Sequence, residues 1–166
     1  MEPSVAVVGA TGAVGEIMRQ VLAERGFAFR SMKFLASERS AGKSIVFKGK
    51  TYLVEPIRPE AFAGVQIVLS STPAGVSREA SPMAAKAGAI VIDNSSAWRM
   101  DPDVPLVVPE VNAEALRNIP KGIVANPNCS TIQMVVALKP LHDLAKIKRV
   151  VVSTYQASSE IGRAHV

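Results

Sequence analysis

Residues 4–26 read SVAVVGATGAVGEIMRQVLAERG, and this stretch decides the fold. Residues 4–8 form an apolar, valine-rich run that Gly9 stops, which is typical of a strand buried on both faces of a parallel sheet. Apolar residues then recur at helical spacing up to Gly26, a residue suited to end a helix. That apolar stripe consists of Val14, Ile17, Met18, Val21 and Leu22.

A glycine loop, residues 9–15 (GATGAVG), joins this strand to this helix. A tight turn needs residues without a Cβ, and phosphate oxygens approach backbone N–H groups only where no side chain intrudes. The helix amino terminus adds partial positive charge. The loop therefore predicts a cradle for a dinucleotide pyrophosphate, the alternative being a tight turn without a ligand. The residues expected at the cofactor are Gly9, Thr11, Gly12, Ala13, Val14 and Gly15.

The rest of the chain alternates between strands and helices. Strands are predicted at 32–36, 65–69, 89–92, 123–125 and 148–155, a hairpin at 44–54 that turns at 48–50, and helices at 73–86, near 113–117 and at 129–144. This order favours an α/β fold with a Rossmann-like, doubly wound and mostly parallel sheet. The last strand is interpreted as the start of a truncated second domain of α+β type.

Composition narrows the class of protein. The chain has 166 residues, 48% of them hydrophobic, which is enough for one domain with a core. Its net charge of +5 comes from scattered Lys and Arg, so phosphorylated small molecules are expected as partners rather than nucleic acid. No apolar run is long enough for a membrane span, and one cysteine excludes an internal disulfide or a cysteine-rich metal site. We expect a cytoplasmic protein without a metal.

The segment SERSAGK at 37–43 follows the second strand, where dinucleotide folds bind the adenosine ribose. Arg39 together with Ser37 and Ser40 suits a 2′-phosphate, because a guanidinium and hydroxyl donors match its oxygens. Glu38 would instead suit the free ribose of NAD. The segment favours NADP; the alternative is a solvated turn.

Cys129 begins a predicted helix after Asn126-Pro127-Asn128. The helix dipole at that position favours the thiolate, which is the nucleophilic form of cysteine. The alternative is a thiol that only fills space in the core.

Four segments, in this order, resemble aspartate-semialdehyde dehydrogenases: GATGAVG, SERSAGK, DNSSAWRM at 93–100 and NPNCSTIQ at 126–133. The similarity extends from residue 4 to 157. N-acetyl-gamma-glutamyl-phosphate reductases share a glycine loop and an Asn-Cys motif but typically differ from this chain in both. The predicted division is a cofactor-binding domain at 1–127, the cysteine helix and first strand of an incomplete catalytic and dimerisation domain at 128–157, and a divergent tail at 158–166.

The resemblance implies an NADP-dependent oxidoreductase of lysine, threonine and methionine biosynthesis, homodimeric when full-length. Cys129 would attack the aldehyde of aspartate semialdehyde, hydride would pass to NADP, and phosphate would release the thioester as aspartyl phosphate; biosynthesis runs this in reverse. By the same resemblance Arg99 holds the substrate phosphate, Gln156 contacts the substrate and Asn128 positions the thiol.

The family's general-base histidine has no counterpart here. His142 lies thirteen residues along a helix from Cys129, roughly 20 Å at 1.5 Å per residue. His165 lies in the tail that departs from the family. The chain is therefore interpreted as an amino-terminal fragment that is inactive or incomplete. The alternatives are an N-acetyl-gamma-glutamyl-phosphate reductase and a non-catalytic nucleotide-binding module.

Overall fold

A computed structural model describes residues 2–155. The strands are β1 (Ser4–Val8), β2 (Ser31–Ala36), β3 (Ser44–Phe47), β4 (Lys50–Pro56), β5 (Ile67–Ser70), β6 (Ile90–Asp93) and β7 (Ile123–Ala125). The α-helices are α1 (Ala13–Glu24), α2 (Ala74–Lys86), α3 (Pro109–Asn112) and α4 (Cys129–Ala145), with 3₁₀ turns at Glu38–Ser40, Pro59–Phe62 and Ala113–Arg117. The chain divides into two compact units, Met1–Asn128 and Cys129–Val166.

The first unit is built on a seven-stranded sheet of order β3-β4-β2-β1-β5-β6-β7. Six strands run parallel, and β3 pairs with β4 in an antiparallel hairpin. Lys48 and Gly49 turn that hairpin with φ of 46° and 74°, the left-handed pair that a two-residue turn requires. The predicted α/β fold with a doubly wound, mostly parallel sheet is confirmed, and the predicted boundaries inside this unit are displaced by one or two residues.

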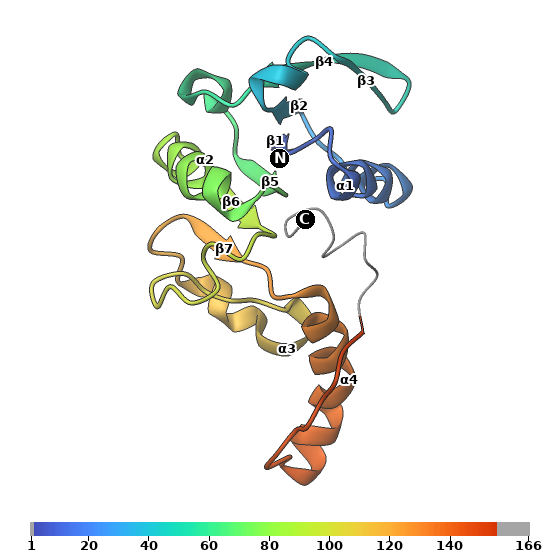
Figure 1. The fold of residues 1–166 in the computed structure, drawn as a ribbon, viewed down its shortest axis with the longest axis vertical. Coiled ribbons are helices and arrows are strands. Elements are labelled where there is room, and N and C mark those ends of the chain that lie inside the picture. Colours follow the sequence, from blue (N-terminus) through green and yellow to red (C-terminus); the bar gives the residue numbers. More distant parts are fainter. Residues whose placement is uncertain (1, 156–166) are drawn as a thin grey trace. The chain divides into compact units, whose positions relative to one another are not determined.

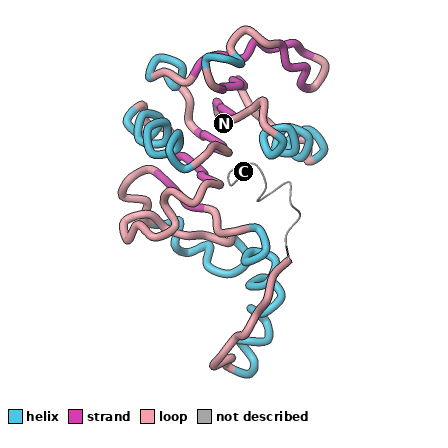
Figure 2. The backbone as a smooth tube through the Cα atoms, in the orientation of Figure 1, coloured by secondary structure: helices cyan, strands magenta, loops and turns pink. Residues whose placement is uncertain are grey.

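β1 lies at the centre of the sheet, and all of its residues are buried. Successive side chains of a strand point to opposite faces. Ala6 and Val8 therefore enter the core beneath α2, whereas Val5 and Val7 enter the core that Met18 of α1 helps to cover. Figures 1 and 2 show α1 and α2 on opposite sides of these strands.

The two edges of the sheet differ. β3 is a strand of four residues whose neighbours on either side are Lys43 and Lys48. At the other edge residues 105–107 run beside β7, where the Ala125 amide donates to the Pro105 carbonyl (2.9 Å) and the Val107 amide donates to the Ala125 carbonyl (3.0 Å).

The apolar stripe of α1 does not pack as one face, contrary to the prediction. Gly15 is buried, and Met18 and Leu22 pack on the core, at the spacing i, i+3, i+7. The helix touches the sheet along this line because Gly15 has no side chain to hold the two backbones apart. The other three residues of the stripe are exposed: Val14, Ile17 and Val21.

The second unit contains α4, which begins at Cys129 as predicted. Lys139 pairs with Asp143 one turn away (2.6 Å), and this hydrogen-bonded ammonium lowers the pKa of the Asp143 carboxyl. The predicted strand at 148–155 is wrong, because these residues form neither helix nor strand. A strand needs a neighbour for its N–H and C=O groups, and no strand within residues 2–155 pairs with this one.

Replacing Phe34 by alanine tests the core on the α1 side. Its ring is fully buried and meets the rings of Phe47 and Tyr52 with centroids 5.5 and 5.2 Å away. Phe34→Ala is expected to lower the free energy of unfolding by about 3–5 kcal/mol, measured by urea denaturation. Phe27→Ala, at a residue that is 36% exposed, serves as control and should cost clearly less than Phe34→Ala. Equal losses would contradict the assignment of this core.

Candidate functional site

The carboxyl ends of the parallel strands lie at one edge of the sheet, which is where open α/β sheets bind ligands. The chain leaves β1 toward β2 on one side, while β5 lies on the other side, so the strand order reverses at β1. The segments that meet this edge are 9–12 after β1, 37–40 after β2, 71–73 after β5, 94–99 after β6 and 126–128 after β7.

Two glycines in the loop after β1 are required by close backbone contacts. Gly9 has φ of 81°, and a Cβ there would overlap the carbonyl oxygen of Ser71. A Cβ at Gly15 would overlap the carbonyl oxygen of Gly9 and lie 2.9 Å from the Cα of Ala10. At Gly12 a Cβ would stay 3.4 Å from the nearest atom, and its amide donates to the Gly9 carbonyl (3.0 Å). The loop is thus a tight cradle of backbone.

The amino terminus of α1 opens from this cradle. Gly12 is its capping residue, and no side chain caps the helix among the described residues. The amide groups of the first turn, which includes Ala13 and Val14, therefore remain available to an anion. The Thr11 hydroxyl lies 3.4 Å from the Ser40 hydroxyl, so the loop after β1 and the turn after β2 meet.

Two hydroxyls beside the cradle were missed by the sequence analysis. Ser70 Oγ and Thr72 Oγ1, at the end of β5, are buried without a hydrogen-bond partner among the described atoms. A methyl carbon of Thr72 lies 3.3 Å from the Cβ position of Gly9. Buried hydroxyls normally have partners, so a polar ligand in the cradle would satisfy the Thr72 hydroxyl, whose side chain borders Gly9. The residues present fit a dinucleotide pyrophosphate.

The turn after β2 carries the residues predicted to distinguish NADP from NAD. Ser37 and Arg39 are exposed and Ser40 is buried. Glu38, which would suit NAD, accepts hydrogen bonds from Nε and Nη2 of Arg58 at 3.1 and 2.8 Å. The Glu38 carboxylate raises the pKa of Arg58 by this contact. No local sequence pattern indicated Arg58, because it comes from the end of β4, twenty residues away.

Arg99 lies at the ends of β6 and β7. Its Nε donates to the Asn126 carbonyl (2.9 Å) and its Nη2 to the Asn94 carbonyl (3.1 Å). The side chains of Asn126 and Asn94 are joined by a hydrogen bond of 2.8 Å. Since both acceptors are neutral carbonyls, the positive charge of the guanidinium is not cancelled, and an anion is the ligand that it can attract.

The remaining predicted residues fall at or beyond the boundary of the units. Asn128 ends the first unit and Cys129 begins the second. Gln156 and the tail 158–166 lie outside the described residues. Between residues 2 and 155, no cluster of three or more His, Cys, Asp or Glu side chains could hold a metal ion. No helix in that part of the chain is both long and apolar enough to cross a membrane.

Comparison with known proteins gives concordant matches. A family model for the semialdehyde dehydrogenase NAD binding domain matches residues 4–119. The aspartate-semialdehyde dehydrogenase of Aquifex aeolicus is 60% identical over 160 residues, 95% of this chain and 47% of that protein. The chain therefore spans about half the length of the curated relatives it matches.

Solved structures agree with the sequence matches. Aspartate semialdehyde dehydrogenase II from Vibrio cholerae, complexed with ASA, has a TM-score of 0.86 at 50% identity and covers 89% of this chain and 49% of that one. The Candida albicans aspartate semialdehyde dehydrogenase with NADP has a TM-score of 0.78 at 29% identity, covering 89% of this chain and 48% of that one.

Alanine at Gly9 tests the cradle. The substitution adds left-handed strain to an overlap with the Ser71 carbonyl, so the free energy of unfolding should fall by about 2–5 kcal/mol. Gly42→Ala is a matched control, because Gly42 has φ of 80° with nothing within 4 Å of its Cβ position. It should lose only the strain, about 1–2 kcal/mol. Equal losses in urea titrations would argue against close backbone contact at Gly9.

Proposed function

Because the chain belongs to the semialdehyde dehydrogenase family, through its NAD-binding domain, we propose that it binds NADP and carries the nucleophile of an aspartate-semialdehyde dehydrogenase. The observation that carries the proposal is the contact between the two predicted cofactor segments, Thr11 to Ser40. A pyrophosphate on the glycine loop would leave its adenosine ribose near the turn after β2. For the whole protein we propose a cytoplasmic homodimer that serves lysine, threonine and methionine biosynthesis.

NADP is proposed over NAD from the charges at the turn after β2. Arg58 draws the Glu38 carboxylate into an ion pair, although both side chains are exposed, at 59% and 68%. The repulsion that this carboxylate would exert on a 2′-phosphate is thereby reduced. Arg39 carries a further guanidinium in the same turn, and hydroxyls stand on both sides of it at Ser37 and Ser40.

We assign the chemistry to Cys129, which begins α4 and is exposed. NADP, when bound, supplies the acceptor for hydride. The thiolate of Cys129 adds to the aldehyde carbon, and after hydride loss the thioester is released by an oxygen of inorganic phosphate, which restores the thiolate. Asn128 would position the thiol and Gln156 would contact the substrate.

Arg99 is proposed to hold the substrate phosphate. Two main-chain carbonyls fix its guanidinium, at 2.9 and 3.1 Å, and neither carries a charge. A cation that is already fixed lowers the cost of binding a doubly charged anion.

We propose no residue of this chain as the general base. His142 occupies α4 thirteen residues after Cys129, roughly 20 Å along the helix axis. That distance exceeds the reach of a proton-transfer hydrogen bond. We propose that turnover requires a base that residues 2–155 do not provide.

Removal of the Arg39 side chain should weaken the binding of NADP without weakening the binding of NAD. Arg39→Ala is expected to weaken NADP binding about tenfold or more, since a charge-assisted hydrogen bond is worth roughly 1.5–3 kcal/mol, and to leave NAD binding unchanged. Isothermal titration calorimetry with each cofactor measures both. Arg25→Ala, at the far end of α1, is the matched control and should change neither. Parallel losses for NADP and NAD would refute the assignment.

Alkylation of the protein's one cysteine tests the nucleophile. Iodoacetamide should modify Cys129 near neutral pH at least about tenfold faster than free cysteine, and NADP or phosphate should slow the reaction. A thiol that only packs would react slowly and show no protection. The 166-residue chain itself should not reduce NADP with aspartate semialdehyde and phosphate. Turnover that Cys129→Ala abolishes would overturn the proposed need for another base.

A further inference from the structure

The strand β6 ends on a carboxylate that the proposed reaction does not use. Asp93 is fully buried. Its Oδ2 accepts hydrogen bonds from the hydroxyls of Ser77 (2.6 Å) and Ser81 (2.9 Å), both on α2, and its Oδ1 accepts from the Ser95 amide (2.7 Å). Burying a carboxylate is costly unless its oxygens are satisfied, and here each oxygen has a partner.

These hydrogen bonds fix the turn that follows β6. The indole Nε1 of Trp98 donates to the same Ser77 hydroxyl (2.8 Å) that donates to Asp93. Within the turn, the Ser95 hydroxyl accepts from the Ala97 amide (3.1 Å). The turn 94–98 is thus attached to α2 at both ends, by Ser95 through Asp93 and by Trp98 through Ser77.

Arg99 is the next residue along the chain. The Asp93 carbonyl accepts from the Asn126 amide (2.8 Å), and the Asn126 carbonyl in turn accepts from Nε of Arg99. Asn94, which accepts from Nη2 of Arg99, lies between Asp93 and Ser95. The two carbonyls that hold the guanidinium therefore belong to residues next to Asp93: Asn126 is hydrogen-bonded to the Asp93 carbonyl, and Asn94 lies between Asp93 and its partner Ser95.

We propose that Asp93, with Ser77, Ser81 and Trp98, forms a positioning network that holds Arg99 ready for the substrate phosphate. An arginine side chain loses rotamer entropy when it is fixed, and a fold that fixes it beforehand spares the binding step that loss. The inference rests on the phosphate-binding role proposed for Arg99. Asp93 touches no substrate in this scheme and acts through the turn.

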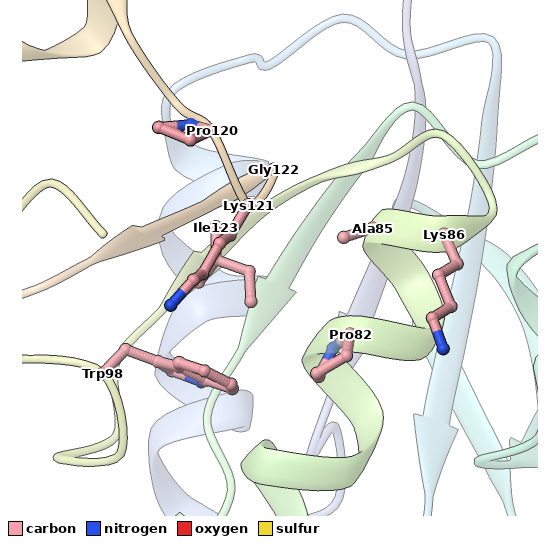
Figure 3. A pocket seen from close by; sticks show the side chains of 8 residues that line it. All are labelled: Pro82, Ala85, Lys86, Trp98, Pro120, Lys121, Gly122 and Ile123. Atoms are coloured by element: carbon pink, nitrogen blue, oxygen red, sulfur yellow. The ribbon is translucent and has the colours of Figure 1, made fainter. Parts of the chain in front are cut away.

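Trp98 provides an internal reporter, because it is the protein's one tryptophan. Its ring borders a pocket of about 370 Å³ between α2 and β7, together with Pro82 and Ile123 (Figure 3). The half-buried indole therefore has a single N–H signal in a ¹H–¹⁵N spectrum, and that signal belongs to the network.

The experiment is a titration of the ¹⁵N-labelled chain with inorganic phosphate, following the Nε–H signals of Arg99 and Trp98. Arg99→Lys assigns the arginine signal. Asp93→Asn keeps the size of the side chain but replaces one accepting oxygen by a donor. It should raise the phosphate dissociation constant and the solvent exchange rate of Arg99 Nε–H each about tenfold, with NADP affinity unchanged.

Two further variants make the test decisive. Trp98→Phe removes the indole donor while keeping an aromatic ring, and it should weaken phosphate binding about threefold, which decides the matter if Asp93→Asn does not fold. Asp101→Asn is the matched control, because Asp101 lies on the same segment but pairs with the exposed Lys121 (2.7 Å). It should leave both signals and phosphate binding unchanged.

The outcomes separate this inference from the proposed function. Suppose that the unmodified chain binds phosphate and that Arg99→Ala abolishes this binding. If Asp93→Asn and Trp98→Phe then bind phosphate as tightly as the control variant, the positioning network is refuted but the proposed role of Arg99 is supported. If the unmodified chain shows no response to phosphate, the role of Arg99 fails and the network falls with it. NADP binding, measured in parallel, tests the cofactor site independently.

Discussion

The first helix lies so close to the loop after β1 that Gly15 has no room for a Cβ, and Gly9 in that loop has none because it lies against the Ser71 carbonyl. The rest of the first unit depends on this contact. It brings the amino terminus of α1 to the end of β1, and it places the loop against Ser71 after β5. Because β1 is flanked by β2 and β5, the turns after these three strands converge there. One backbone approach therefore determines where an anion can bind and which side chains surround it.

Local patterns predicted most of the fold because each element of the first unit carries its own signal. Each signal is local: the valine-rich run forms β1, Lys48 and Gly49 form the turn between β3 and β4, and a proline immediately precedes α2. What could not be predicted depends on distant partners. The orientation of α1 follows from the space at Gly15, and residues 148–155 have strand-forming side chains but no strand beside them in the part of the chain described. In the candidate site the loops could be predicted from the sequence. The contacts and burial of Arg58, Ser70 and Asp93 could not.

Two arginines at the same edge of the sheet have opposite electrostatic roles. Arg58 forms an ion pair with the Glu38 carboxylate, so its positive charge offsets the negative charge of that carboxylate. Within residues 2–155, Arg99 donates to carbonyl oxygens of the main chain, which orient the guanidinium without neutralising it. The difference lies in the partner and not in the arginine. A sequence shows that both cations are present, but which one keeps its charge for a ligand is a property of the folded chain.

The two edges of the sheet limit how this protein can associate with other chains. An exposed strand edge is a template on which another chain can add a strand. Here one edge is a hairpin strand of four residues with a lysine on either side, and the other is paired with the segment that begins at Pro105. Growth of the sheet from molecule to molecule is therefore disfavoured at both ends. Self-assembly of the first unit, where it occurs, should proceed through helical or loop surfaces and not by extension of its sheet.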